Sequence, residues 1–207
     1  MSSKRQIDDD TDFNLKSKQS KRIASILERS LIESMRNLPK LNFLVFGPGI
    51  GARNYKSHRL AVKQMIIKKK EQNADFPEEV DKALGQIRNR SRPSFEKKIL
   101  ANPATKELVM ARGYDYIILP LMNLGPIAEF SRFAGDPAIA PKIRLFIPKK
   151  HAKSKGFVNT GPVKAFKDAY DQVKIFKNAK ELLKKAEETV DSLIVIRLYQ
   201  SGQPNPY

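Results

Sequence analysis

Short apolar segments that stop abruptly, with helical patterns between them, restrict the fold of this chain more than any other feature. Residues 41–51 (LNFLVFGPGIG) and 114–126 (YDYIILPLMNLGP) are rich in large apolar residues and end at Gly and Pro. This pattern is typical of buried parallel strands that run into turns. Residues 142–150 and 171–178 predict two further strands, and residues 73–79 predict a short one.

Helical patterns separate these strands. Residues 78–90 carry an apolar face after Pro77, Asn102 and Pro103 begin a helix that ends at Gly113, and residues 178–199 keep helical spacing without a turn signal. Alternating strands and helices predict an α/β fold, a flavodoxin- or Rossmann-like parallel sheet of about five strands with helices on both faces. Ligands of such sheets bind at the carboxyl ends of the strands.

The chain of 207 residues divides into three predicted parts. Residues 1–19 are polar and predict a disordered tail, residues 20–40 predict an N-terminal helix, and residues 41–200 form the domain. The predicted helix has an apolar stripe that packs either on the domain's own sheet or on a partner, so a homodimer through residues 20–40 is one expectation. The stripe consists of Ile23, Ile26, Leu27, Leu31, Met35 and Leu38.

The composition excludes several classes of protein. With no Cys there is no disulfide framework, no Cys-based zinc site and no thiol nucleophile. We expect neither a metal nor a cofactor. The N-terminal residues lack an apolar signal region, and no run approaches the roughly 18 apolar residues of a membrane span. We therefore expect a cytoplasmic protein without a membrane partner.

Basic residues outnumber acidic ones by 39 to 22, and the formal net charge is +17. Residues 142–155 carry six basic side chains and no acid. Such stretches attract phosphates of nucleic acid or of a nucleotide, although a solvated basic face that keeps the protein soluble has the same composition. The candidate phosphate or nucleic-acid contacts are Arg53, Lys149, Lys150, Lys153 and Lys155.

Glu129 is the candidate catalytic residue. It follows a predicted core strand, and Gly125 and Pro126 read as the N-cap and the first residue of a helix, which places Glu129 in the first turn. The helix dipole favours a carboxylate there by roughly 0.3 to 1 kcal/mol, so we expect Glu129 to be ionised near neutral pH. An ordinary first-turn acid would have the same position.

Other candidates for substrate binding lie in loops at predicted strand ends. The glycines of residues 46–53 allow a ligand to approach the backbone, and their amides can bind phosphate or hydroxyl groups. Either Glu78 or Glu79 could accept hydrogen bonds from sugar hydroxyls or assist Glu129 in proton transfer, although both also suit a helix start. The set is Gly47, Pro48, Gly49, Glu78, Glu79, Asn123, Gly125 and Asn159.

Four segments, in order, resemble the nucleoside deoxyribosyltransferase-like family, and in particular the N-glycosidase-type effectors found with bacterial retrons. They are LNFLVFGPG, NADFPEEV, YDYIILPLMNLGPIAEFSRFA and KIRLFIPKKHAKSKGFVNTGPVK, within residues 41–199. The resemblance implies an antiphage effector that cleaves the N-glycosidic bond of a nucleoside, a nucleotide or a nicotinamide dinucleotide. It also implies that Glu129 attacks or stabilises the anomeric carbon. Nucleic acid or a retron-type complex are expected as further partners.

A different class of function is compatible with the same sequence. A binding or assembly module could keep this fold and use its basic face to hold nucleic acid or a partner. The chain has no Trp and 8% aromatic residues, which speaks against a dedicated RNA-binding sheet with stacking aromatics.

Overall fold

The structure is a computed structural model. It describes residues 21–26, 29, 33, 39–49, 51–87, 101–122, 124–152 and 161–201, without the side chains of residues 84–87 and 124. The predicted tail, residues 1–19, lies outside the described residues. Lys40–Val195 form one compact unit, and Met1–Pro39 with Ile196–Tyr207 are assigned to a second. In the second unit residues 21–26 are helical, and Ile23 and Ile26 are exposed.

The larger unit is built on a parallel sheet of five strands, as predicted. The strands are β1 (Asn42–Val45), β2 (Asn73–Asp75), β3 (Tyr116–Pro120), β4 (Ile143–Pro148) and β5 (Val173–Phe176). Their order in the sheet is β2-β1-β3-β4-β5, the flavodoxin-like arrangement. β2, the next strand along the chain, pairs with one side of β1, and β3 pairs with the other side of β1. The strand order therefore reverses between β1 and β3.

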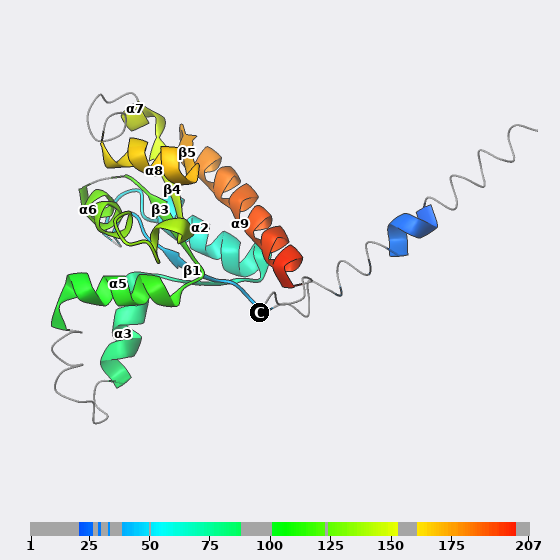
Figure 1. The fold of residues 1–207 in the computed structure, drawn as a ribbon, viewed down its shortest axis with the longest axis horizontal. Helices are drawn as coiled ribbons and strands as arrows, with labels where there is room; N and C mark the ends of the chain where they lie inside the picture. Colours follow the sequence, from blue (N-terminus) through cyan, green and yellow to red (C-terminus); the bar gives the residue numbers. More distant parts are fainter. Residues whose placement is uncertain are drawn as a thin grey trace, which may run out of the picture. The chain divides into compact units, whose positions relative to one another are not determined.

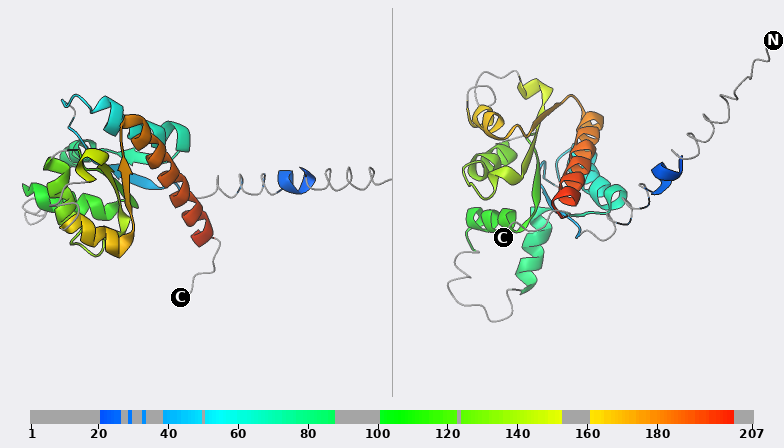
Figure 2. Two further views of the ribbon diagram at one scale, coloured as in Figure 1. Left: turned by 90° about the horizontal axis from the view of Figure 1, so that it is seen from above. Right: turned by 45° about the vertical axis from the view of Figure 1, so that its right-hand side comes forward.

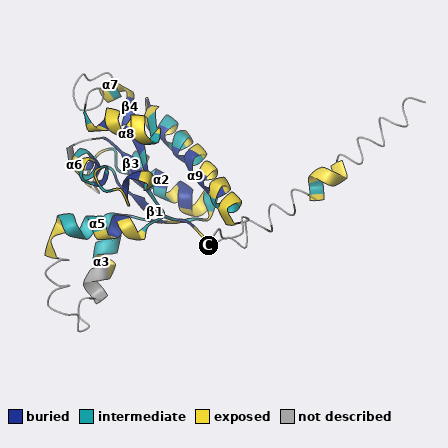
Figure 3. Ribbon diagram, in the orientation of Figure 1, coloured by how far each residue is buried: buried dark blue, intermediate teal, exposed yellow. Residues whose placement is uncertain are grey.

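Alternating side chains of the strands build two separate cores. Phe43 and Val45 of β1 contribute to one core, and Leu44 between them contributes to the other. All three side chains are fully buried, which is why the strands read as continuous apolar runs. Figure 3 shows the buried strands between helices whose outer sides are exposed.

Helices cover both faces of this sheet (Figures 1 and 2). The core with Phe43 is closed by α2 (Ala61–Gln64) and α9 (Ala179–Ser201), and the core with Leu44 is closed by α5 (Pro103–Gly113), α6 (Leu124–Phe133) and α8 (Pro162–Tyr170). The remaining described helices are η1 (Lys56–Leu60), η2 (Met65–Lys69), α3 (Pro77–Ile87), η3 (Ala140–Lys142) and α7 (Lys149–Ala152).

The helical stretch η1–α2–η2 is one element that the sequence patterns did not predict. Its buried positions are Arg59, Val62, Met65 and Ile66, at helical spacing. An arginine at the first of these positions interrupts the apolar stripe and hides the pattern. Among the described residues, no helix is long and apolar enough to cross a membrane.

The predicted start of α5 is confirmed, and it yields a first testable prediction. The Asn102 side-chain oxygen accepts hydrogen bonds from the amides of Ala104 (2.9 Å) and Thr105 (3.2 Å), two groups that have no partner within the helix. We expect Asn102→Ala to lower the free energy of unfolding by about 1 kcal/mol, measured by urea denaturation. Asn102→Asp retains the cap and should retain the stability; an equal loss in both variants would contradict this role.

Candidate active site

A cavity of about 530 Å³ opens where the order of the strands reverses. Its walls come from the loop after β1, with Phe46 and Gly47, from the start of α3, from α5 and from α6. This is the carboxyl edge of the sheet, where ligands of doubly wound folds bind. The lining residues are Phe46, Gly47, Gly49, Arg59, Pro77, Glu78, Asp81, Pro103, Lys106, Glu107, Met110, Gly125, Pro126 and Glu129.

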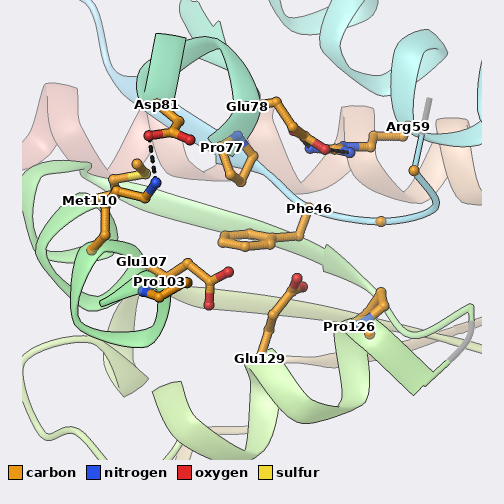
Figure 4. A pocket seen from close by; sticks show the side chains of 14 residues that line it. Phe46, Arg59, Pro77, Glu78, Asp81, Pro103, Glu107, Met110, Pro126 and Glu129 are labelled. Carbon is orange, nitrogen blue, oxygen red and sulfur yellow. Dashed lines mark hydrogen bonds and ion pairs between the residues drawn. The ribbon is translucent and has the colours of Figure 1, made fainter. Parts of the chain in front are cut away.

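Glu129 lies in this cavity with one oxygen unsatisfied. Its side chain extends from α6 toward Phe46 and Glu107 (Figure 4). Its Oε2 is buried, and no described group of the protein forms a hydrogen bond with it. A buried polar atom without a partner destabilises the folded protein, typically by about 1 to 3 kcal/mol, so such atoms are rare in folded proteins.

The protonation of Glu129 differs from the prediction. The pKa of Glu129 is raised from 4.5 to about 7, mainly by burial and also by the charges of Glu107 and Glu78, while the charges of Arg59 and Arg132 oppose the rise. The helix begins at Leu124, so Glu129 is its sixth residue rather than part of its first turn. The dipole effect falls off within the first turn and cannot offset burial. Near neutral pH the carboxyl group is therefore divided between its two forms.

Arg59 and Glu78 form a bidentate ion pair at the cavity wall. The Arg59 guanidinium donates from Nη1 and Nη2 to the two oxygens of Glu78, at 2.8 and 2.5 Å, and from Nε to the carbonyl of Val45 at 3.1 Å. Arg59 is 2% exposed, whereas the Glu78 side chain is 48% exposed and faces the cavity. A carboxylate fixed in this way can accept hydrogen bonds from a ligand.

The cavity is more acidic than the chain as a whole. Four carboxylates line it, and its two cations are both paired, Arg59 with Glu78 and Lys106 with Asp81 at 2.5 Å. Glu107 is paired with Arg132 at 2.5 Å. This arrangement suits hydroxyl donors and developing positive charge better than it suits phosphate.

The structure brings together only part of the predicted site. Five of the predicted residues line the cavity, namely Gly47, Gly49, Glu78, Gly125 and Glu129. Glu79 is not among the lining residues; it pairs with Lys63 and accepts a hydrogen bond from the amide of Phe76, which caps α3. Of the two acids left open by the sequence, Glu78 is thus the one at the cavity.

The predicted phosphate contacts do not gather at this cavity. Arg53 is exposed in a turn, and Lys149 and Lys150 are exposed on α7; none of them is a lining residue. Pro48 is buried but does not line the cavity either. Asn123, Lys153, Lys155 and Asn159 lie outside the described residues.

Among the cavity residues that the sequence reasoning did not recognise, Arg59 and Glu107 each had a signal in the sequence. Arg59 shares a helical face with the buried Val62 and Ile66, and Glu107 precedes the buried Met110 and Ala111 by three and four residues. A charged residue at an apolar position of a helix indicates a buried ion pair or a site. The described residues contain no group of three or more His, Asp or Glu side chains that could hold a metal ion.

The fold and cavity together define an α/β protein with flavodoxin-like strand order and a carboxylate-lined pocket at the reversal point. Residues 55–203, more than half of the chain, match the family model described as STM3845 retron effector protein. The chain therefore belongs to this retron effector family, which supports a role in antiphage defence. No curated protein matches the chain significantly.

The match confirms the retron-effector part of the resemblance seen in the sequence. Because it begins at residue 55, it does not include β1 or the Gly-Pro turn that follows. The resemblance to nucleoside deoxyribosyltransferases stays a prediction, as do the enzymatic activity and the homodimer.

Proposed function

We propose that this chain is an antiphage effector that hydrolyses the N-glycosidic bond of a nucleoside, a nucleotide or a nicotinamide dinucleotide. The observation that carries the proposal is the Glu129 carboxyl group, which has an unpartnered oxygen in a cavity at the carboxyl edge of the sheet. The retron effector family supplies the biological setting. A complex with other components of a retron is part of the same proposal.

The arrangement of charges suits this chemistry. Cleavage of a C–N glycosidic bond passes through a transition state in which positive charge develops on the sugar, and nearby carboxylates stabilise it more than they stabilise a neutral substrate. Glu129 and Glu107 line one part of the cavity, and Glu78 lies at another. The ring of Phe46, which is buried, lies between them (Figure 4).

The reaction proceeds in two steps in this proposal. The ionised Glu129 attacks the anomeric carbon, the C–N bond breaks, and the base leaves with its electron pair. The base of a nucleoside or nucleotide then takes up a proton, whereas the pyridinium ring of a nicotinamide dinucleotide leaves as neutral nicotinamide without one. Water then attacks the same carbon, the bond to Glu129 breaks, and the free sugar and the ionised carboxylate are restored with release of a proton. Glu78 accepts hydrogen bonds from the sugar hydroxyls throughout.

The proposal predicts how the rate depends on pH. Only the ionised Glu129 can attack, and the ionised fraction grows as pH rises through its pKa of about 7. We expect kcat/KM to increase about tenfold per pH unit below this value and to level off above it. The check is kcat/KM across buffers from about pH 5 to pH 9; a rate that is flat over this range, or falls, would contradict attack by Glu129.

The experiment that tests the function is an assay of product. Purified protein is incubated with a mixture of nucleosides, nucleotides and nicotinamide dinucleotide, and released free base is identified by mass spectrometry. Release by the parent chain and its loss in Glu129→Gln support the proposal. Release of no base, or equal release by both proteins, overturns it.

A second candidate function follows from the exposed basic residues outside the cavity. The lysines Lys149 and Lys150 are exposed on α7, while the cations of the cavity are already paired with acids. A module that binds nucleic acid would use Lys149 and Lys150 and would not need Glu129. Binding to single-stranded DNA that weakens steeply with salt, and is unchanged in Glu129→Gln, favours this function.

A further inference from the structure

We propose that Arg59 is the positioning residue of this cavity, which holds the Glu78 carboxylate in its orientation and supplies positive charge near Glu129. The effect on catalysis rests on the proposed function. The effect on the two carboxyl groups does not, and it can be measured without turnover.

Arg59 joins three elements that are far apart in the sequence. It lies on η1, its Nε donates to Val45 at the end of β1, and its two Nη atoms donate to Glu78 on α3. Its guanidinium lies 4.4 Å from the centre of the Phe76 ring, at the end of β2. A side chain with four such contacts has one orientation, so it transmits that orientation to Glu78.

The loop after β1 lies against this arginine. Gly47 has φ +138°, a conformation that other residues rarely adopt, and a Cβ atom there would lie 3.5 Å from Cβ of Arg59. Glycine is therefore needed for the backbone conformation of this turn, whereas a Cβ atom there would make only ordinary van der Waals contact with Arg59. The loop and the arginine together form the wall of the cavity next to Glu78.

The charges around the two carboxyl groups support a second role for Arg59. Burial acts to raise the pKa of Glu78, but hydrogen bonds from Arg59 and the backbone, with the charge of Arg59, leave it below its ordinary value. For Glu129, Arg59 is the strongest of the charges that oppose the rise in pKa. The charged groups around Glu129 are Glu107 and Lys106 of α5, Glu78 and Asp81 of α3, Arg132 of its own helix and Arg59.

A neighbouring ion pair provides a matched control. Lys63 lies one helical turn after Arg59, pairs with Glu79, and lies 4.6 Å from the centre of the same Phe76 ring. Neither Lys63 nor Glu79 lines the cavity. The acids of both pairs lie on α3, their cations lie on the consecutive helices η1 and α2, and both cations contact Phe76, but only the Arg59–Glu78 pair lines the cavity.

The first experiment is an NMR titration of the full chain labelled with ¹³C at the Glu carboxyl carbons, in the parent, Arg59→Met, Arg59→Lys and Lys63→Met. In Arg59→Met the titration midpoints of the Glu78 and Glu129 carboxyl groups should both rise by about half a pH unit or more, because a positive charge is lost. Arg59→Lys keeps the positive charge but loses the bidentate hydrogen bonding to Glu78. The titration midpoint of Glu78 should therefore rise, while that of Glu129 should not change. Lys63→Met should leave both midpoints in place.

The second experiment separates binding from chemistry with the substrate that the parent chain cleaves. Arg59→Lys should raise KM roughly tenfold with little change in kcat, because Glu78 is no longer held for the sugar hydroxyls. In a Glu78→Gln background, Arg59→Lys should raise KM no further, since the residue through which it acts is gone. Lys63→Met should leave KM within about twofold of the parent value.

The outcomes separate this proposal from the proposed function. A parent chain that releases no base overturns the function, and the midpoints alone then decide the role of Arg59. Unchanged midpoints in Arg59→Met, or equal shifts in Lys63→Met, overturn the positioning role even in an active enzyme. If Arg59→Met does not fold, the titration midpoint of Glu78 in Arg59→Lys is the test of the positioning role. A rise in this midpoint supports the proposal, and no change overturns it.

Discussion

Release of free base is expected to fall by about a thousandfold or more in Glu129→Gln, because the amide can neither attack the anomeric carbon nor stabilise the charge that develops on the sugar. Glutamine has nearly the same size and shape as glutamate, so the buried surroundings of Glu129 stay filled. The measurement is kcat/KM by quantitative mass spectrometry of the product.

Ser131→Ala is the matched control for this variant. Ser131 lies on the same helix two residues further on, is exposed, and donates a hydrogen bond to the carbonyl of Ile127. We expect its kcat/KM to stay within about twofold of the parent, since surface substitutions rarely change the fold. A thousandfold loss in both variants would indicate damage to α6, and a fully active Glu129→Gln would remove Glu129 from the mechanism.

The substitution Glu129→Gln is also expected to stabilise the protein at alkaline pH. The pKa of Glu129 is raised from 4.5 to about 7 in the folded protein. Folding therefore favours the protonated group: below the unfolded pKa there is no penalty, and the penalty grows as pH rises toward the folded value and is complete above it. Glutamine cannot ionise and escapes this penalty, which is roughly 3 kcal/mol when complete.

Urea denaturation of both proteins at about pH 5 and pH 9 tests this prediction, with conditions chosen on either side of the titration. The stability of Glu129→Gln relative to the parent should increase by roughly 2 to 3 kcal/mol between the two conditions. If the difference in the free energy of unfolding between Glu129→Gln and the parent is the same at both pH values, Glu129 titrates as an ordinary exposed acid. Opposite changes in activity and stability are typical of residues kept for function.

Much of the site could be anticipated because strand ends are visible in the sequence. Apolar runs that stop at Gly and Pro located Gly47 and Gly125, and both line the cavity. The choice between Glu78 and Glu79 could not be made, since adjacent residues of a helix point in different directions and only the neighbouring elements decide which direction is the cavity. Lys63 holds Glu79 away, and Arg59 holds Glu78 at the wall.

The charges of the site were the least predictable part. Glu107 and Arg59 are 48 residues apart in the sequence, and both act on the pKa of Glu129. The first-turn rule did not apply, because α6 begins at Leu124, and burial between α6 and its neighbours raises the pKa of Glu129. The basic stretch at residues 142–155 suggested a phosphate site, yet Lys149 and Lys150 lie outside the cavity.

The sequence by itself determined the parallel sheet, several of the helices around it and the edge at which a site can form, because these depend on the spacing of apolar residues along a short stretch of chain. Only the tertiary structure decided which acids meet in the cavity, which cations are already paired, and that the Glu129 carboxyl group titrates near neutral pH. Burial and charge pairing arise between segments that are distant in the sequence, and their strength depends on distances that no local pattern contains.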